Sequence, residues 1–326
     1  MKAIVCSEFG PVDTLSYMDV EAQPLTSGQA LIQVHACGIN FPDILLVQGK
    51  YQVRPELPFF PGGEVAGVVT EVAADVTTVK KGQRVMATIF WGGLAEQAVA
   101  PAKAVVPIPP NIDFITASVF QGGHTTSYYA LKQRGQLHAG ETLLVLGAAG
   151  GVGLAAVQLG KAMGARVIAA VSSEEKRACA LRNGADESIN YGREDLRERT
   201  KALTDGRGAD VIFDPVGGDQ FDQATRCVNS NGRILVVGFA SGRIPQYAVN
   251  LALLKSCSIV GVNYQYFFAA ERQQVEENFT ELMRMVSEGK IKPHIDKVYP
   301  LKHAAEALQY VGDRKSIGKV VVSVPK

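Results

Sequence analysis

The amino-acid sequence predicts an α/β protein made of a β-rich domain and a doubly wound parallel sheet. Three observations carry this prediction. Apolar, partly β-branched runs alternate with helical stretches from residue 142 onward, which is typical of a parallel sheet covered by helices. Before that point, short apolar runs recur between glycine or proline pairs at 62–63, 92–93 and 109–110, which favours antiparallel strands joined by turns. The 326 residues exceed what one hydrophobic core usually serves, so two domains are expected.

The elements follow in order along the chain. Strands of the β-rich domain are expected at residues 2–6, 29–36, 64–72, 83–88, 94–99 and 105–108. The six strands of the parallel sheet are expected at 142–146, 166–171, 187–191, 211–216, 233–237 and 256–262, with helices at 154–164, 176–181, 194–203 and 220–228. After residue 264, an amphipathic helix and a last strand at 319–324 are expected to return to the first domain. The expected boundaries are therefore 1–121 with 264–326 for the β-rich domain, and 122–263 for the parallel sheet.

The glycine-rich stretch at 147–153 follows the first strand of the parallel sheet and opens a helix. A strand, a glycine turn, a helix and a second strand within about thirty residues form the context of a dinucleotide-binding fingerprint. Gly150 lets the backbone approach a pyrophosphate, Gly153 allows close packing of the helix on the strand, and the helix N-terminus offers N–H groups to the phosphates. The expected contacts are Ala149, Gly150, Gly151 and Val152. Ala148 replaces the first fingerprint glycine, and a glycine turn without a ligand is the less favoured alternative.

The end of the second strand indicates which dinucleotide binds. An NAD site usually places an acid about 20 residues after the fingerprint, at the ribose 2′-hydroxyl. Here the strand ends in Ser172-Ser173, followed by Glu174, Glu175 and Lys176. Hydroxyl and ammonium groups can bind a 2′-phosphate, so Ser173 and Lys176 favour NADPH. Ser172 and Glu175 also have the spacing of a helix capping box, and both interpretations can hold at once.

The composition excludes several classes of protein. Apolar and charged fractions of 47% and 20% are those of an ordinary globular protein, and a net charge of +1 gives no argument for binding nucleic acid or an anionic membrane. No apolar run reaches the ~20 residues of a membrane-spanning helix. The five cysteines are scattered and never form a C-x-x-C pair, which predicts reduced thiols and a cytoplasmic location.

These motifs, in this order, resemble the medium-chain dehydrogenase/reductase superfamily, and within it the zinc-free quinone oxidoreductase (zeta-crystallin-like) branch. The resemblance runs from Met1-Lys2-Ala3 to Gly318-Lys319-Val320-Val321. It implies a GroES-like catalytic domain, a Rossmann domain with a parallel six-stranded sheet, NADPH as the cofactor, and a homodimer. In that dimer the last Rossmann strands, here 256–262, pair with each other.

The resemblance also predicts that no metal is bound. Zinc alcohol dehydrogenases of the superfamily carry a ligand cysteine where this chain has Asn40, and a ligand histidine where it has Gly63. Neither residue can replace a zinc ligand. The four-cysteine lobe of a structural zinc site is absent, and the five histidines form no ligand cluster.

Three residues are predicted to be catalytic by resemblance. Asn40 and Asp43 match residues of the pocket floor beside the nicotinamide, where Asn40 can donate a hydrogen bond to the substrate oxygen. An equally favoured interpretation makes Asp43 a helix cap before residues 44–46. Tyr51 aligns with the proton-donating tyrosine of similar enoyl reductases, although quinone reductases carry it too. Glu64 matches a glutamate near the active site and is at least as well explained by a structural role.

Further cofactor contacts follow from the same resemblance. Thr125 matches a contact of the nicotinamide, Tyr191 a tyrosine near the adenosine phosphate, and Arg314 an arginine that reaches the 2′-phosphate. Phe239 and Ser241 belong to the loop that passes the carboxamide. Each of these residues alone can equally be a turn or surface residue.

The predicted function is therefore NADPH-dependent, metal-independent transfer of hydride to a quinone or another conjugated carbonyl, because addition to a conjugated system spreads the charge without a metal. The alternative on the same fold is a reductase of enoyl thioesters or 2-haloacrylate-type acids. A non-enzymatic NADPH-binding protein is the less favoured second class.

Overall fold

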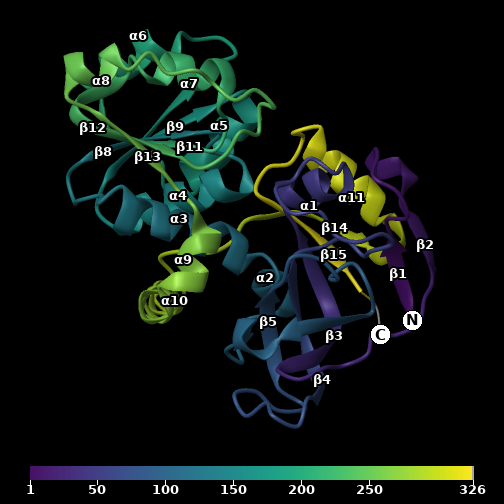
Figure 1. The fold of residues 1–326 in the computed structure, drawn as a ribbon. Coiled ribbons are helices and arrows are strands. Elements are labelled where there is room, and N and C mark those ends of the chain that lie inside the picture. Colours follow the sequence, from purple (N-terminus) through teal and green to yellow (C-terminus); the bar gives the residue numbers. More distant parts are fainter. Residues whose placement is uncertain (325–326) are drawn as a thin grey trace. The chain divides into compact units, whose positions relative to one another are not determined.

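The computed structural model describes residues 1–324, which form two compact units (Figure 1). One unit comprises Met1–Gly122 and the chain from Pro293 onward, and the other comprises Gly123–Lys292. The chain returns to the first unit later than residue 264, the position expected from the sequence. Residues 264–292 remain with the second unit because they pack on it: the rings of Tyr129 and Phe267 stack with centroids 4.1 Å apart, and Lys132 pairs with Glu281 at 2.7 Å.

The first unit is built on a seven-stranded sheet in the order β14-β15-β3-β4-β5-β7, with β6 also paired to β3. Its strands are β3 (Gln29–Ile39), β4 (Glu64–Val72), β5 (Arg84–Thr88), β6 (Gln97–Pro101), β7 (Val105–Pro107), β14 (Ile295–Pro300) and β15 (Lys319–Ser323). All pairs are antiparallel except β14 with β15. A separate ribbon joins β1 (Lys2–Val5) to β2 (Ser16–Asp19). The mostly antiparallel prediction is confirmed, but β2 and β14 were not expected, since charged residues interrupt their apolar pattern: Asp19 in β2, and Asp296 and Lys297 in β14.

The helices of this unit are short. They are α1 (Phe41–Val47), α2 (Phe114–Ala117) and α11 (Ala304–Gly312), with 3₁₀ turns at Val12–Thr14, Ala102–Ala104 and Leu301–His303. The core lies between the sheet and α1 and α11, where Ile32, Val34, Ile44 and Leu308 are buried in one cluster. This packing places the N-terminus of α1, with Asn40 and Asp43, beside the first residues of β4 and β15.

The second unit contains the predicted parallel six-stranded sheet, in the order β10-β9-β8-β11-β12-β13. The strands are β8 (Thr142–Leu146), β9 (Arg166–Val171), β10 (Glu187–Asn190), β11 (Ala209–Asp214), β12 (Val228–Val236) and β13 (Ser258–Gly261). The chain therefore runs outward from β8 to β10, then crosses back to β11, so the sheet is doubly wound. Figure 1 shows α3 and α4 on one side of this sheet and α7 and α8 on the other.

The connecting helices are close to the predicted ones. They are α3 (Thr126–Tyr129), α4 (Gly151–Ala162), α5 (Glu174–Arg182), α6 (Leu196–Leu203), α7 (Gly218–Ala224), α8 (Asn250–Lys255), α9 (Tyr264–Ala270) and α10 (Arg272–Ser287), and π-helical turns flank α3 at Gln121–Thr125 and Ala130–Arg134. The helix expected at 220–228 ends earlier, because Val228 already pairs with Ala209 in the sheet. Within residues 1–324, no helix has both the length and the apolar character that crossing a bilayer requires.

Candidate functional site

The glycine turn after β8 has the geometry of a nucleotide-binding turn. Gly147 adopts a φ of 57°, and the Gly150 N–H donates to the Gly147 carbonyl at 2.9 Å. A Cβ on Gly153 would lie 2.2 Å from that same carbonyl oxygen, so only glycine lets α4 start this close to the turn. The first N–H groups of α4, at Gly151, Val152 and Gly153, have no acceptor inside the helix, as at the helix N-termini that commonly bind anions.

The helical stretch before β8 contacts this turn. Ser127 Oγ donates to the Val152 carbonyl at 2.8 Å, and a Cβ on Gly123 would lie 3.4 Å from the Gly151 carbonyl. Thr125 is buried in the same stretch. The structure therefore brings Thr125 into the neighbourhood of the predicted phosphate turn. Tyr128, on the following turn, directs its hydroxyl at Glu281, and burial raises the pKa of that phenol.

The loop after β9 holds the residues expected to select NADPH. Ser173, rather than the Ser172 of the predicted capping box, caps α5, since its hydroxyl accepts the Lys176 N–H at 3.3 Å. Glu174 accepts a hydrogen bond from Asn190 Nδ2 at 2.6 Å, which lowers the pKa of its carboxyl, and lies 3.6 Å from Arg177. The acid that would oppose a 2′-phosphate is therefore engaged by its own neighbours.

The remaining predicted cofactor residues of this unit lie at the same edge of the sheet. The Tyr191 N–H, just after β10, donates to the Val171 carbonyl at the end of β9 at 3.0 Å. Ser241, in the loop after β12, donates its N–H to the Val216 carbonyl after β11 at 2.8 Å. Phe239 in that loop is 39% exposed. These loops thus lie at the carboxyl ends of neighbouring parallel strands, beside the glycine turn. Open α/β sheets bind their ligands at this edge.

Asp214, at the end of β11, was not singled out from the sequence. Its buried carboxylate accepts the N–H groups of Val216 and Gly217 at 2.8 and 2.9 Å, and burial raises its pKa. A Cβ on Gly147 would lie 2.8 Å from Val216 Cγ2, so this turn packs against the glycine turn where the strand order reverses. Asp214 therefore fixes the turn after β11, which packs against the glycine turn, and its role in the candidate site is structural.

The first unit brings Asn40 and Asp43 together at the start of α1. Asn40 precedes the helix, and its N–H donates to Asp43 Oδ2 at 2.7 Å. The capping interpretation of Asp43 is thereby confirmed, although the carboxylate caps from inside the first turn. Asp43 is buried, and burial raises its pKa to about 7, against the opposing effects of the Asn40 N–H and the Lys319 charge. A buried carboxyl that titrates near neutrality is also a common feature of active sites.

The Asn40 amide lies in a buried network with Glu64 and Lys319. Asn40 Oδ1 accepts from Lys319 Nζ at 2.6 Å, and Asn40 Nδ2 donates to Glu64 Oε2 at 3.1 Å. The other Glu64 oxygen accepts the Gly122 N–H at 2.8 Å, and Lys319 Nζ lies 3.4 Å from Glu64 Oε2. The side chains of Lys319 and Glu64 are only 6% and 1% exposed. This is a buried ion pair, and its two members bind the oxygen and the nitrogen of one amide.

Lys319 was not among the residues that the sequence singled out. The signal was present, because a lysine that opens the apolar run at 319–324 stands in a strand expected to be buried. It was hidden because Lys319 joins Asn40 and Glu64 only in three dimensions, when β15 pairs with β3 beside α1.

Two predicted residues lie elsewhere in the first unit. Tyr51 follows α1 and packs, half-buried, against the hydrophobic core. Arg314 lies in the turn between α11 and β15 with a left-handed φ of 57°. The roles of both residues stay predictions.

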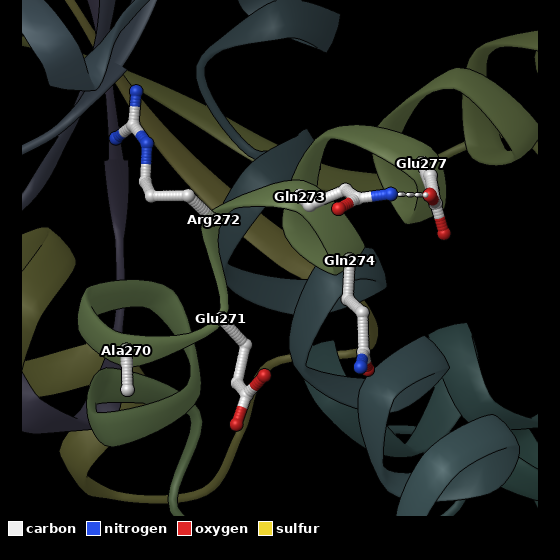
Figure 2. A pocket seen from close by; sticks show the side chains of 6 residues that line it. All are labelled: Ala270, Glu271, Arg272, Gln273, Gln274 and Glu277. Carbon is white, nitrogen blue, oxygen red and sulfur yellow. Dashed lines mark hydrogen bonds between the residues drawn. The ribbon is translucent and has the colours of Figure 1, made fainter.

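A separate hollow of about 340 Å³ lies at the junction of α9 and α10 (Figure 2). It is lined by Ala270, Glu271, Arg272, Gln273, Gln274 and Glu277. Figure 2 shows the Gln273 and Glu277 side chains hydrogen-bonded to each other on one helix. The hollow contains none of the predicted site residues.

Within residues 1–324, no three histidine, cysteine or acidic side chains are grouped to hold a metal ion. At the positions of the superfamily's zinc ligands, Asn40 binds Lys319 and Glu64, and a Cβ on Gly63 would lie 3.4 Å from Asp43 Oδ1. Cys37 is fully buried, and burial raises the pKa of its thiol. These donors do not fit a zinc site.

Comparison with known proteins agrees with this arrangement. Residues 26–110 match the family described as alcohol dehydrogenase GroES-like domain, and residues 151–288 match the one described as zinc-binding dehydrogenase. The chain is 41% identical to the quinone oxidoreductase-like protein 2 homolog of Nematostella vectensis, covering 99% of this chain and 88% of that protein. It is 32% identical to the quinone oxidoreductase of Rattus norvegicus, covering 99% and 97%.

A solved structure, the Escherichia coli quinone oxidoreductase complexed with NADPH, has a TM-score of 0.93 at 29% identity, covering 99% of this chain and 100% of that one. Both family matches, the full-length relatives and the replaced zinc positions lead to one conclusion. This chain belongs to the zinc-free quinone oxidoreductase branch of the medium-chain dehydrogenase/reductase superfamily.

Proposed function

We propose that this protein is an NADPH-dependent reductase of quinones or other conjugated carbonyls, and that it needs no metal. The glycine turn carries the proposal, because its close helix start presents the N–H groups of Gly151, Val152 and Gly153 as an anion-binding end. Relatives named quinone oxidoreductase, and a similar enzyme solved with NADPH, support it.

The residues around the turn fit a dinucleotide that bears a 2′-phosphate. Ser173 accepts one backbone N–H but keeps its own hydroxyl proton to donate, and Lys176 adds a positive charge one helical turn later. Glu174, which would repel the phosphate, is engaged with Asn190 and Arg177. Arg314 is the proposed third ligand. We therefore expect Ser173, Lys176 and Arg314 to hold the 2′-phosphate, and Tyr191, Phe239, Ser241 and Thr125 to line the remainder of the cofactor.

When bound, the reduced nicotinamide supplies the hydride. The chain's part is to orient the acceptor and stabilise the oxygen that gains charge, and the Asn40 amide is the proposed donor to that oxygen. Asp43 accepts the backbone N–H of Asn40, and this hydrogen bond fixes the backbone that carries the Asn40 amide. The proton then comes from water or from Tyr51.

We further propose a homodimer formed through β13. This strand lies at the end of the six-stranded sheet, where one side of its backbone is an open edge. The segment just before it exposes large apolar side chains: Ile244, Val249, Leu253 and Leu254 are each more than 70% exposed. Single exposed apolar residues are ordinary, but four within a short segment beside a sheet edge favour a surface that a partner covers.

The five cysteines are free and buried, which favours a reducing, cytoplasm-like compartment.

A substrate panel tests the choice of acceptor. The wild-type chain and Tyr51→Phe are assayed with NADPH against phenanthrenequinone and crotonyl-CoA. A quinone reductase turns over the quinone with saturation, and the loss of the phenol changes kcat less than about twofold. Turnover of crotonyl-CoA, abolished by Tyr51→Phe, would replace the quinone proposal with an enoyl reductase. Binding of NADPH without oxidation by either acceptor would indicate a non-enzymatic protein.

A further inference from the structure

The buried network around Asn40 contains a cation, Lys319, which has no role in the function proposed above. We propose that Lys319 is a positioning residue that sets the orientation of the Asn40 amide and strengthens its remaining N–H as a hydrogen-bond donor to the substrate oxygen. This inference rests on the proposed function, because it assigns the donor at the same site.

The orientation of the amide follows from the chemistry of its partners. An ammonium can only donate hydrogen bonds and a carboxylate can only accept them. Lys319 Nζ lies 2.6 Å from Asn40 Oδ1, and Glu64 Oε2 lies 3.1 Å from Asn40 Nδ2. Rotating the amide by half a turn would direct its NH₂ at the ammonium and its carbonyl at the carboxylate. The buried pair therefore selects one of the two rotamers that a free asparagine would otherwise share.

One N–H of the amide stays available. Asn40 Nδ2 carries two hydrogens, and one of them is directed at Glu64. The second makes no hydrogen bond with the residues that the structure describes. Asn40 is half-buried, whereas Lys319 and Glu64 behind it are buried. The amide is thus the member of the network that can reach a ligand, and it can do so only as a donor.

The ammonium also changes the strength of that donor. A charge-assisted hydrogen bond to the amide oxygen shifts electron density toward the oxygen and leaves the N–H groups more positive. The effect persists because the cation is buried, where neither water nor salt screens it well. Lys319 is itself held by the Ile39 carbonyl at 3.4 Å and by Glu64, which the Gly122 N–H fixes in turn. A fixed donor aimed at an oxygen that gains charge is the usual device for stabilising an oxyanion.

Steady-state kinetics of Lys319→Met test the inference. This change keeps the length of the side chain but removes its charge and its donors. We expect kcat with a quinone to fall roughly 10- to 100-fold, the range found when a group that orients a functional ligand is removed. The Kd for NADPH, measured by titration, should stay within about twofold. The control is Lys2→Met, in the same unit, which removes an exposed pair with Asp19 at 2.6 Å and should leave kcat unchanged.

A double-mutant cycle with Asn40→Ala separates positioning from a general structural effect. If Lys319 acts through the amide, Lys319→Met should change kcat less than about twofold once Asn40 is alanine. An equal loss in both backgrounds would overturn the proposal. Because an unpaired Glu64 can prevent folding, Lys319→Met is also made together with Glu64→Gln, which removes both charges. The folded double variant should show the same loss of kcat, and wild-type kcat in it would refute a role for the cation.

A spectroscopic readout distinguishes failure of this inference from failure of the proposed function. The side-chain ¹⁵N–¹H₂ signals of Asn40, assigned by their absence in Asn40→Asp, should shift in Lys319→Met and not in Lys2→Met. If the wild-type chain reduces no quinone, the proposed function fails while this shift still reports the orientation. If the signals do not move, Lys319 does not hold the amide, whatever the substrate.

Discussion

The substitution Asp43→Asn tests the electrostatics at the start of α1. Asp43 is buried beside Asn40, Glu64, Lys319 and Cys37, and burial raises its pKa to about 7. An asparagine has nearly the same shape as the protonated acid, and its Oδ1 can still accept the Asn40 N–H. The variant therefore mimics the neutral form of Asp43 at every pH.

The magnitude follows from proton linkage. An unfolded aspartate has a pKa near 3.9. Between pH 4 and 7 the folded chain thus binds a proton that the unfolded chain has lost, so the contribution of Asp43 to stability falls as the pH rises and is gone above pH 7. The slope is about 1.4 kcal/mol per pH unit. From pH 5 to pH 8 the wild-type chain should lose about 3 kcal/mol that Asp43→Asn does not lose.

The assay is urea unfolding at pH 5 and pH 8, followed by tryptophan fluorescence. Trp91 is the chain's single tryptophan and packs against the core of the first unit, so the signal reports that unit. Asp75→Asn is the control: Ser27 and Gly28 lower the pKa of Asp75, so it is ionised in both states over this range. If the stability difference between Asp43→Asn and wild type is the same at both pH values, Asp43 is an ordinary ionised carboxylate and the reasoning fails.

Three further predictions concern the second unit. Gly153→Ala places a Cβ 2.2 Å from the Gly147 carbonyl, so it should destabilise the chain by about 1–3 kcal/mol in urea and weaken NADPH binding in a titration; unchanged binding would contradict the role of the turn. Leu253→Asp puts a charge on a side chain that is 81% exposed, and light scattering should show monomers in place of dimers; a dimer of wild-type affinity would exclude this surface. Arg233 forms two 2.8 Å bonds to Glu141 and donates to three backbone carbonyls, so Arg233→Lys should lower thermal stability by about 1–3 kcal/mol, and no change in Tm would show that the fork geometry is unimportant.

Much of the fold could be predicted because its signals are local. The runs at 142–146 and 166–171 are so apolar that the strands end where the pattern ends, and the glycine turn between them has one structural context. The predicted boundaries differ from the structure where tertiary contacts override the local sequence pattern. Val228 was expected to end a helix, but it pairs in strand β12. Residues 264–292 were expected in the first unit, but they belong to the second because Phe267 stacks on Tyr129.

The candidate site was less predictable than the fold. Ser173, Lys176 and Tyr191 could be placed at one sheet edge because parallel strands carry their carboxyl ends there. The partners of Asn40 could not be predicted in this way. Lys319 lies far along the chain and reaches the amide only through antiparallel pairing of β15 with β3, which a local pattern does not encode.

The most direct test of the central claim is the ratio of kcat/KM for NADPH to that for NADH, measured with one quinone at saturation. If the proposal that Ser173, Lys176 and Arg314 hold the 2′-phosphate is right, we expect NADPH to be favoured at least tenfold, or about 1.4 kcal/mol. Lys176→Ala should bring the two cofactors closer together by raising the KM for NADPH alone. Equal efficiency with NADH in the wild-type chain would contradict the assignment of these residues and of the cofactor.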